Sequence, residues 1–304
     1  MERELTGRTA LGYGLVVAAV TMFSLNASLA LFLLDDGLSA MRLSELRSAG
    51  ALLLLVLVVA VVRPAGLRIE RSEVPRFAVL GIAGLALVYV TYFVAIERLG
   101  VGPALTLEYL APLLLLVWLR FAHGRRLSPA LWAAVAISLA GSALVVRAYD
   151  PSALDVAGVA AGLGAAISFA IYFAGSERAG RRHPPLVTLL WAFGFSTAFW
   201  LVIQPPWTFP ADQLDTGGDL ALAAAIVVIG TLLPFGLIVA ALRHVPAARA
   251  AAVATLEPAL SALFAFVIHD EALAAVQIAG IAIVLAAVAW VQLQRPDIAA
   301  ESIG

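Results

Sequence analysis

The first half of the sequence returns in the second half after a constant interval. Adding 146 to a residue number leads to the same residue type at many positions, for example Gly12 and Gly158, Gly84 and Gly230, Pro112 and Pro258. Repeats of this kind define the architecture before any finer feature does. The interval predicts two domains, residues 1–146 and 147–292, followed by a tail at 293–304.

Composition places both copies in a membrane. Apolar residues make up 62% of the 304 residues and charged residues 13%, which is too apolar for a soluble domain. The apolar runs are continuous and about 20 residues long, as membrane helices require, whereas barrel strands are shorter and alternate. We therefore predict an all-α integral membrane protein with ten transmembrane helices, at residues 10–34, 43–62, 76–96, 102–121, 129–147, 154–176, 186–204, 219–242, 247–268 and 273–292.

Arginine placement predicts the orientation of these helices. All 19 basic residues are arginine, and with ten helices 15 of them fall on the side of the N-terminus. The other side keeps Arg42, Arg47, Arg98 and Arg147. Because basic residues concentrate in cytoplasmic segments, we expect both termini in the cytoplasm. Each copy holds five spans, so the second copy is inverted, as in transporters that work by alternating access.

Missing residue types exclude several functions. The chain has no cysteine, which excludes disulfides and thiolate metal sites. It also has no lysine, which excludes a nucleotide-binding P-loop. We expect no cofactor, no metal site and no nucleic-acid partner. An integral-membrane enzyme, the alternative from another class, would need His, Asp or Glu residues clustered at one membrane face, and the sequence lacks this pattern.

Two related strings of residues carry a family resemblance. The second half has Val-Pro-Ala-Ala-Arg at 245–249, Leu-Glu-Pro at 256–258, an acidic turn at 270–271 and Gly280 in its last helix. A degenerate version occupies residues 104–112 of the first half. This pattern resembles the EamA-type repeat of the drug/metabolite transporter superfamily. The resemblance implies the ten-helix fold with two inverted repeats.

A narrower resemblance concerns the Leu-Glu-Tyr stretch at 107–109, before Pro112. It is similar to bacterial exporters of threonine and homoserine or of aromatic amino acids. The resemblance implies a secondary transporter of the bacterial inner membrane that exports small metabolites, above all aromatic or other neutral amino acids. A drug or nucleotide-sugar carrier on the same scaffold is the alternative. The expected partners are the small-molecule substrate, the lipid bilayer and protons.

Two acidic residues lie within predicted spans. A charge at mid-bilayer costs about 2.5–3.5 kcal/mol on insertion scales, so Glu108 and Glu257 need a reason to be there. They are candidates to bind a substrate ammonium or a proton. The alternative is a structural role, in which each acid accepts hydrogen bonds beside the proline that follows it. Pro112 and Pro258 occupy equivalent places and are candidate hinges, because proline interrupts a helix.

Polar and aromatic residues complete the candidate substrate cavity. Asn26 and Tyr172 are equivalent through the repeat, and Ser168 lies one turn before Tyr172. The alternative for these residues is hydrogen bonding between packed membrane helices. Aromatic rings would bind apolar side chains or a cation, or else belong to the interfacial belt; the candidates are Tyr89, Tyr92, Tyr109 and Trp191. Arg42, Glu45 and Arg47 are expected at the outer end of the second span. They would gate the outer vestibule or bind a carboxylate, or else they are snorkelling, mutually paired charges.

Overall fold

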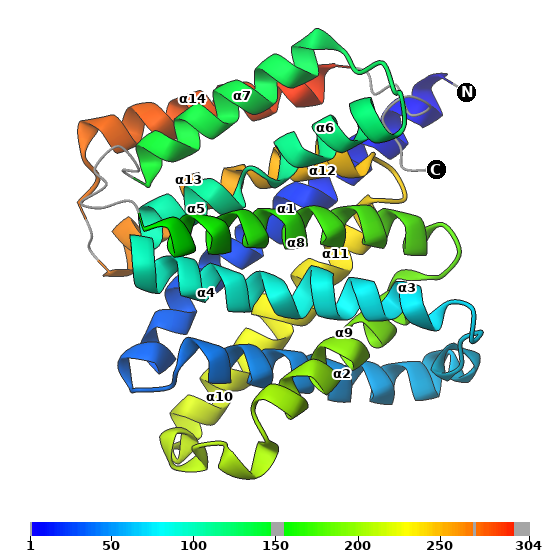
Figure 1. Ribbon diagram of the computed structural model, residues 1–304, viewed down its shortest axis with the longest axis vertical. Coiled ribbons are helices and arrows are strands. Elements are labelled where there is room, and N and C mark those ends of the chain that lie inside the picture. The colour runs from blue at the N-terminus through cyan, green and yellow to red at the C-terminus, as the bar shows by residue number, and fades with distance from the viewer. Residues whose placement is uncertain (1, 147–154, 270–271, 295–304) are drawn as a thin grey trace.

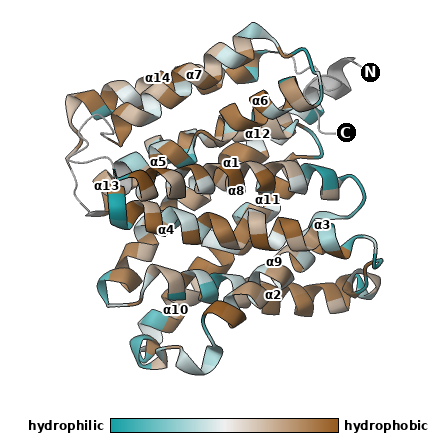
Figure 2. Ribbon diagram, in the orientation of Figure 1, coloured by the Kyte–Doolittle hydropathy of each residue, from teal (hydrophilic) through white to brown (hydrophobic). Residues whose placement is uncertain are grey.

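The computed structural model describes residues 2–146, 155–269 and 272–294, and these residues form helices and their connections without a strand. Nine helical stretches in the described ranges are long and apolar enough to cross a bilayer, and Pro129–Val145 adds a shorter apolar helix. Hydrophobic residues cover the helices, whereas hydrophilic residues gather near helix ends and in connections (Figure 2). The predicted all-α fold with ten spans is confirmed.

The first repeat contains α1 (Glu2–Asp35), α2 (Ala40–Val62), α3 (Val74–Ala78), η2 (Val79–Ala86), α4 (Leu87–Leu99), α5 (Val101–Glu108), α6 (Ala111–Ala122) and α7 (Pro129–Val145). The second contains α8 (Val156–Gly180), α9 (Pro185–Ile203), α10 (Gly217–Val227), η5 (Val228–Leu232), α11 (Leu233–Ala241), α12 (Ala247–Ala254), α13 (Leu256–His269) and α14 (Ala275–Leu293). Short 3₁₀ turns follow α2 (η1, Pro64–Leu67) and α9 (η3, Pro206–Thr208, and η4, Ala211–Leu214).

The third and fourth spans of each repeat are interrupted, where the sequence predicts continuous helices. The fourth spans break after α5 and α12, whose bounds differ by the repeat interval. Proline explains both ends: Pro112 and Pro258 have no N–H to donate to the carbonyls of Glu108 and Ala254, four residues earlier. The third spans contain the π-helical segments η2 and η5. The repeat therefore extends to the irregularities of the helices.

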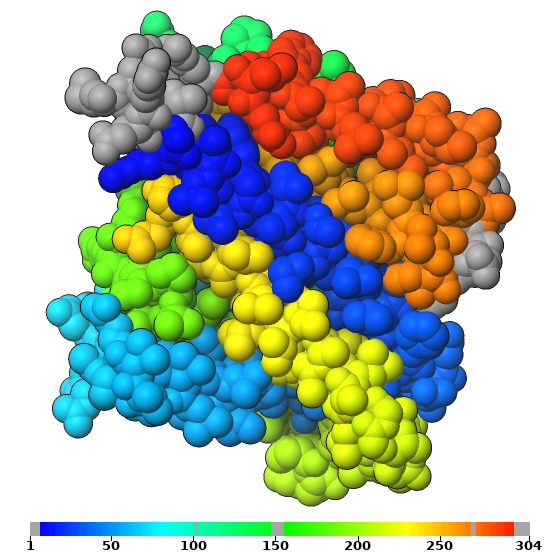
Figure 3. All heavy atoms as spheres, turned by 180° about the vertical axis from the view of Figure 1, so that it is seen from behind, coloured from blue at the N-terminus to red at the C-terminus, as the bar shows by residue number. Residues whose placement is uncertain are grey.

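The two repeats pack crosswise (Figure 1). Helix α1 of the first repeat contacts α11, α13 and η5 of the second, and α8 of the second contacts α4, η2 and α5 of the first. Figure 3 shows α1 lying between α11 and α13 on the rear face. The second spans α2 and α9 pair with each other, as do the fifth spans α7 and α14. Most of the interior is thus an interface between the copies.

Two equivalent glycines allow helices of the two repeats to pack closely against each other. A Cβ atom on Gly84 of η2 would lie 3.1 Å from the Cα of Tyr172 in α8. A Cβ atom on Gly230 of η5 would overlap the side-chain oxygen of Asn26 in α1. Small residues at such crossings let membrane helices approach closely. The two crossings are equivalent, because Gly84 and Gly230 are related by the repeat interval and so are Asn26 and Tyr172.

The first residues of α1 and the last residues of α14 lie at one end of the bundle, which we call the terminal end (Figure 1). At the opposite end, Arg98 in the last turn of α4 and Asp155 before α8 form an ion pair of 3.0 Å that joins the two repeats. This hydrogen bond from Arg98, together with the N–H of Gly158, holds the pKa of Asp155 below its ordinary value. Asp155 also caps α8 through that N–H.

The absence of native cysteines allows a direct test of orientation. Ser72 is exposed at the terminal end and Asp212 is exposed at the opposite end. If the arginine-rich terminal end faces the cytoplasm, a membrane-impermeant maleimide will label Asp212→Cys in intact spheroplasts. Ser72→Cys will be labelled only after the membrane is opened. Labelling of Ser72→Cys but not Asp212→Cys in intact spheroplasts would reverse the predicted orientation.

Candidate functional site

A buried arginine joins the two repeats in the middle of the bundle. Arg47 lies in α2, and its Nε donates to the Thr231 hydroxyl at 2.8 Å while its Nη2 donates to the Gly230 carbonyl at 3.1 Å. Pro234, four residues later, has no N–H and so cannot donate the α-helical hydrogen bond to that carbonyl. The guanidinium also lies over the ring of Tyr89, 5.1 Å from its centroid. A cation in the membrane is thereby supplied with polar partners on α4 and η5.

Two carboxylates accompany this guanidinium. Glu108 ends α5 and Glu257 lies in the first turn of α13, so both acids sit where the fourth spans are interrupted. They interact electrostatically with each other, and Glu257 also interacts with Arg47. The Tyr109 hydroxyl donates a hydrogen bond to the Glu257 carboxylate. The central cluster, as we call Arg47, Tyr89, Tyr92, Glu108, Tyr109 and Glu257, thus holds two acids and one base.

The two acids have different surroundings. Negative charge on Glu257 is stabilised by Tyr109, by Arg47 and by the N-terminal end of α13. Glu108 ends a helix, where the helix dipole disfavours an acid, and it faces the charge of Glu257. Both side chains are half-buried, although their neighbours come from both repeats. Part of each acidic residue is therefore accessible.

The predicted tyrosines of the first repeat lie at these acids. Tyr89 and Tyr92 of α4 both interact electrostatically with Glu108 and Glu257. Both tyrosines are half-buried, whereas Tyr109 is buried and meets the ring of Phe169 edge-on, with centroids 6.3 Å apart. The structure thus brings Tyr89, Tyr92 and Tyr109 together with both acids.

Three other candidates lie at the crossings of the first helices. Asn26 is buried against Gly230, and Tyr172 is buried against Gly84 with its ring edge-on to Phe235 at 5.3 Å. Ser168 is buried one turn before Tyr172 in α8. These contacts support close packing of α1 and α8 against the interrupted third spans. A role in lining the cavity stays a prediction for all three.

Trp191 lies away from the acids, whereas the candidate hinges Pro112 and Pro258 lie near them. The indole N–H of Trp191 donates to the Gly66 carbonyl at 3.0 Å, which ties α9 to η1 at the terminal end and away from the central cluster. Pro112 and Pro258 each follow an interruption of the fourth span. Their placement supports hinge motion, which stays a prediction.

The depth of Arg47 corrects the sequence interpretation, which put it among charges at the outer end. Helix α2 starts at Ala40 rather than 43, because Ser39 caps it by accepting from the N–H of Arg42. Arg47 is therefore the eighth residue of the helix, roughly 11 Å from its start at 1.5 Å per residue. A serine immediately before an apolar helix is a known N-cap signal, and it could have revealed this depth.

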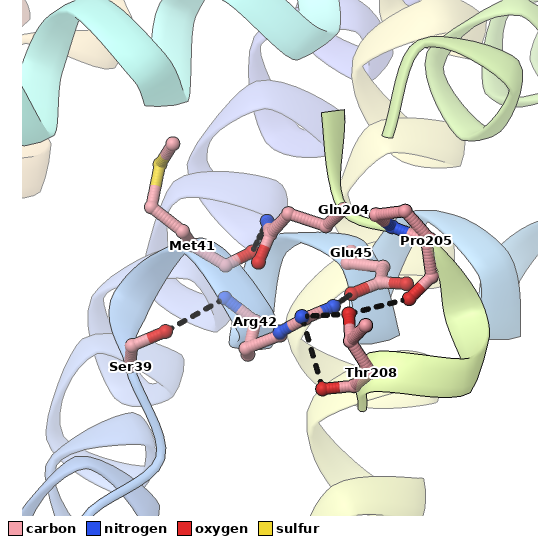
Figure 4. A network of polar contacts seen from close by, with 7 residues as sticks. All are labelled: Ser39, Met41, Arg42, Glu45, Gln204, Pro205 and Thr208. Atoms are coloured by element: carbon pink, nitrogen blue, oxygen red, sulfur yellow. Dashed lines mark hydrogen bonds and ion pairs between the residues drawn. The ribbon is translucent and has the colours of Figure 1, made fainter. Parts of the chain in front are cut away.

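The other two charges at that end form a separate network (Figure 4). Arg42 pairs with Glu45 at 2.7 Å and donates to the Thr208 carbonyl at 3.0 Å. Gln204 donates to the Met41 carbonyl at 3.0 Å. This network holds the turn after α9 against the start of α2 and neutralises Glu45. Glu45 is thus engaged by Arg42, whereas Arg47 lies within electrostatic range of Glu257.

Part of the family pattern has a structural role at the terminal end. Arg249 of α12 is buried and donates to the carbonyls of Val291 and Gln294, at 3.0 and 2.9 Å. The buried carboxylate of Glu177 accepts from the N–H of Ala247 at 2.7 Å and so caps α12. These charges fasten helix ends. The acidic turn at residues 270–271 and Arg147 lie outside the described residues.

The fold and the charged interior define the class: a membrane transporter built from two inverted repeats. The profile of the EamA-like transporter family matches residues 10–147 and 156–293. The chain belongs to this family.

Individual relatives agree with this assignment. Threonine/homoserine exporter RhtA of Salmonella typhimurium (strain SL1344) is 27% identical over 251 residues, which cover 83% of this chain and 79% of the relative. The inner membrane transporter YicL of S. typhimurium (strain LT2), itself uncharacterised, is 26% identical over 204 residues, or 66% of each chain. One solved crystal structure shares the fold, with a TM-score of 0.74 at 21% identity over 93% of this chain and 96% of that one. The chain is a multi-pass protein of the bacterial inner membrane.

Proposed function

We propose that the protein exports neutral amino acids from the cytoplasm by alternating access, with the central cluster as the binding site. The observation that carries this proposal is the presence of both charge signs in the middle of the bundle, from Arg47, Glu108 and Glu257. An amino acid at neutral pH carries one carboxylate and one ammonium group. Each would meet an opposite charge within a single site.

The charge balance of the cluster separates this proposal from the nucleotide-sugar alternative. A nucleotide sugar brings phosphate groups, which proteins bind with several basic groups. The cluster has more acids than bases, so it disfavours such a ligand. The similarity to RhtA, which is named a threonine/homoserine exporter, supports an amino-acid substrate. A lipid-modifying enzyme would need reactive groups in addition to these three charges. We therefore propose a transporter without catalytic activity.

In this proposal the Arg47 guanidinium binds the substrate carboxylate, since arginine matches carboxylate geometry. Glu108 and Glu257 bind the ammonium group. The half-buried rings of Tyr89 and Tyr92 contact the substrate side chain, where an aromatic face accepts apolar groups. Aromatic and small neutral side chains are both compatible with these contacts.

The interrupted helices supply the moving parts. Both acids lie at the breaks of the fourth spans, so bending there would move them relative to Arg47 on the uninterrupted α2. The equivalent breaks in the two inverted repeats would open the site alternately to each side. Ionising both acids leaves one negative charge without a partner, and such a charge is costly in a membrane. A proton and the substrate ammonium would compete for that acid, which couples export to proton entry.

A substrate panel tests the proposal. Proteoliposomes preloaded with single amino acids should exchange at least one neutral amino acid, and Glu108→Gln or Glu257→Gln should weaken its apparent affinity about 10- to 100-fold. This range corresponds to losing one hydrogen bond to a charged group. Glu97→Gln is the matched control, because Glu97 is exposed at the end of α4. No exchange by the wild-type protein across the panel would refute amino-acid transport.

The pH dependence of substrate affinity tests whether Glu108 or Glu257 binds the coupled proton. Because protonation of an acid removes a partner of the ammonium group, the apparent affinity for substrate should fall as the pH is lowered. The dependence should flatten in Glu108→Gln, whose acid has the fewer stabilising neighbours, more than in Glu257→Gln. Initial exchange rates measured against substrate concentration from acidic to alkaline pH give the affinities. An identical pH profile in wild type and both variants would exclude the two acids as the proton site.

A further inference from the structure

A pocket on the outside of the bundle lies apart from the central cluster. It has a volume of about 370 Å³ and is bounded by α3 and η2, by Trp118 of α6 and by the last turns of α8. Figure 1 shows α3, α6 and α8 on the same face of the molecule, and the pocket is at its terminal end. The volume falls within the range of about 300–1,000 Å³ that is usual for small-molecule sites.

The pocket opens toward the lipid. Two of the hydrophobic side chains that line it are exposed: Val79 is 54% exposed and Trp118 39%. Its floor is apolar, formed where Leu80 of η2 meets Gly175 of α8 and where Phe77 and Ile171 lie beside them. Such a surface suits a hydrocarbon chain rather than a soluble metabolite.

The rim of the pocket is basic. Arg76, Arg178 and Arg182 line it, and all three are exposed. None of their guanidinium groups forms an ion pair or hydrogen bond with another residue in the part of the chain that the structure describes. The one acid in the lining, Glu73, is engaged by His183 at 2.9 Å. An apolar floor and an arginine rim therefore occur together at the level where membrane helices end.

We propose that this pocket binds an anionic phospholipid. The phosphodiester group is held by Arg76, Arg178 and Arg182, and an acyl chain lies on the floor between η2 and α8. Guanidinium groups are suited to phosphate oxygens, and basic pockets between membrane helices are known sites for anionic lipid headgroups. The bound lipid contacts η2, the interrupted part of the third span, and so braces its crossing with α8.

Lipid binding to the purified full chain tests this proposal. Native mass spectrometry from detergent should show phosphatidylglycerol binding at least about tenfold more tightly than phosphatidylcholine, because the charge-assisted contacts are lost with the neutral headgroup. The combined variant Arg76→Gln, Arg178→Gln and Arg182→Gln should abolish this preference. The matched control Arg63→Gln, Arg68→Gln and Arg71→Gln removes the same charge from the same end, outside the pocket, and should keep it.

Two further experiments separate binding of the whole lipid from binding of its headgroup alone, and from the effects of misfolding. Ala174→Phe fills the floor without touching an arginine, and it should weaken phosphatidylglycerol binding even if the triple variant does not fold. Glycerophosphoglycerol, which has the headgroup but no acyl chains, should not compete. Equal binding of both lipids to the wild type, equal loss in the control triple variant, unchanged binding in Ala174→Phe, or effective competition by the headgroup alone would each overturn the proposal.

Discussion

The interactions of Arg47 determine what the middle of this membrane protein can do. A guanidinium in the bundle interior requires partners, and it finds them in the Thr231 hydroxyl, the Gly230 carbonyl and the ring of Tyr89. Glu257 lies within electrostatic range of this cation, and we propose that it balances the charge. Glu108 then brings a second negative charge to a central cluster that holds one cation. The substrate ammonium and the proton are the cations that we propose for it.

The crosswise packing of the repeats makes this arrangement possible. Arg47 and Glu108 come from the first repeat, whereas Thr231 and Glu257 come from the second. No single repeat could complete the cluster. The breaks that hold the two acids follow from Pro112 and Pro258, which deprive the carbonyls four residues earlier of their donors. The same chemistry at Pro234 gives Arg47 the Gly230 carbonyl. Prolines thus both interrupt these helices and leave backbone carbonyls in the interior without their usual donors.

Much of the architecture could be predicted because it follows from long apolar runs and from the repeat. The observed spans begin and end within a few residues of the expected ones, as α7 at 129–145 and α14 at 275–293 show. The family resemblance at 107–109 and 256–258 also indicated the two acids and Tyr109. The sequence also shows the prolines of the fourth spans. It does not predict the π-helical segments η2 and η5, because hydropathy carries no information about hydrogen-bond register.

The position of Arg47 shows why the rest of the site was harder to predict. Hydropathy placed the start of the second span after Arg42, and the cap at Ser39 moves it to Ala40. A shift of three residues is nearly one helical turn, enough to bring an apparent surface charge into the interior. Partners such as Thr231 are distant in sequence and belong to the other repeat, so no local pattern connects them with Arg47. Asn26 and Tyr172 were singled out correctly as equivalent, but their close contact with glycines depends on the crossing geometry.

The coupling between Arg47 and Glu257 tests this account most directly. The free energy of unfolding should be measured by SDS titration for wild type, Arg47→Gln, Glu257→Gln and the double variant. If Arg47 and Glu257 balance each other, removing one charge leaves the other uncompensated, whereas removing both does not. We therefore predict that the double variant is about 1–3 kcal/mol more stable than the sum of the single effects. Additive effects would show that the two charges do not balance each other, and the central claim would fail.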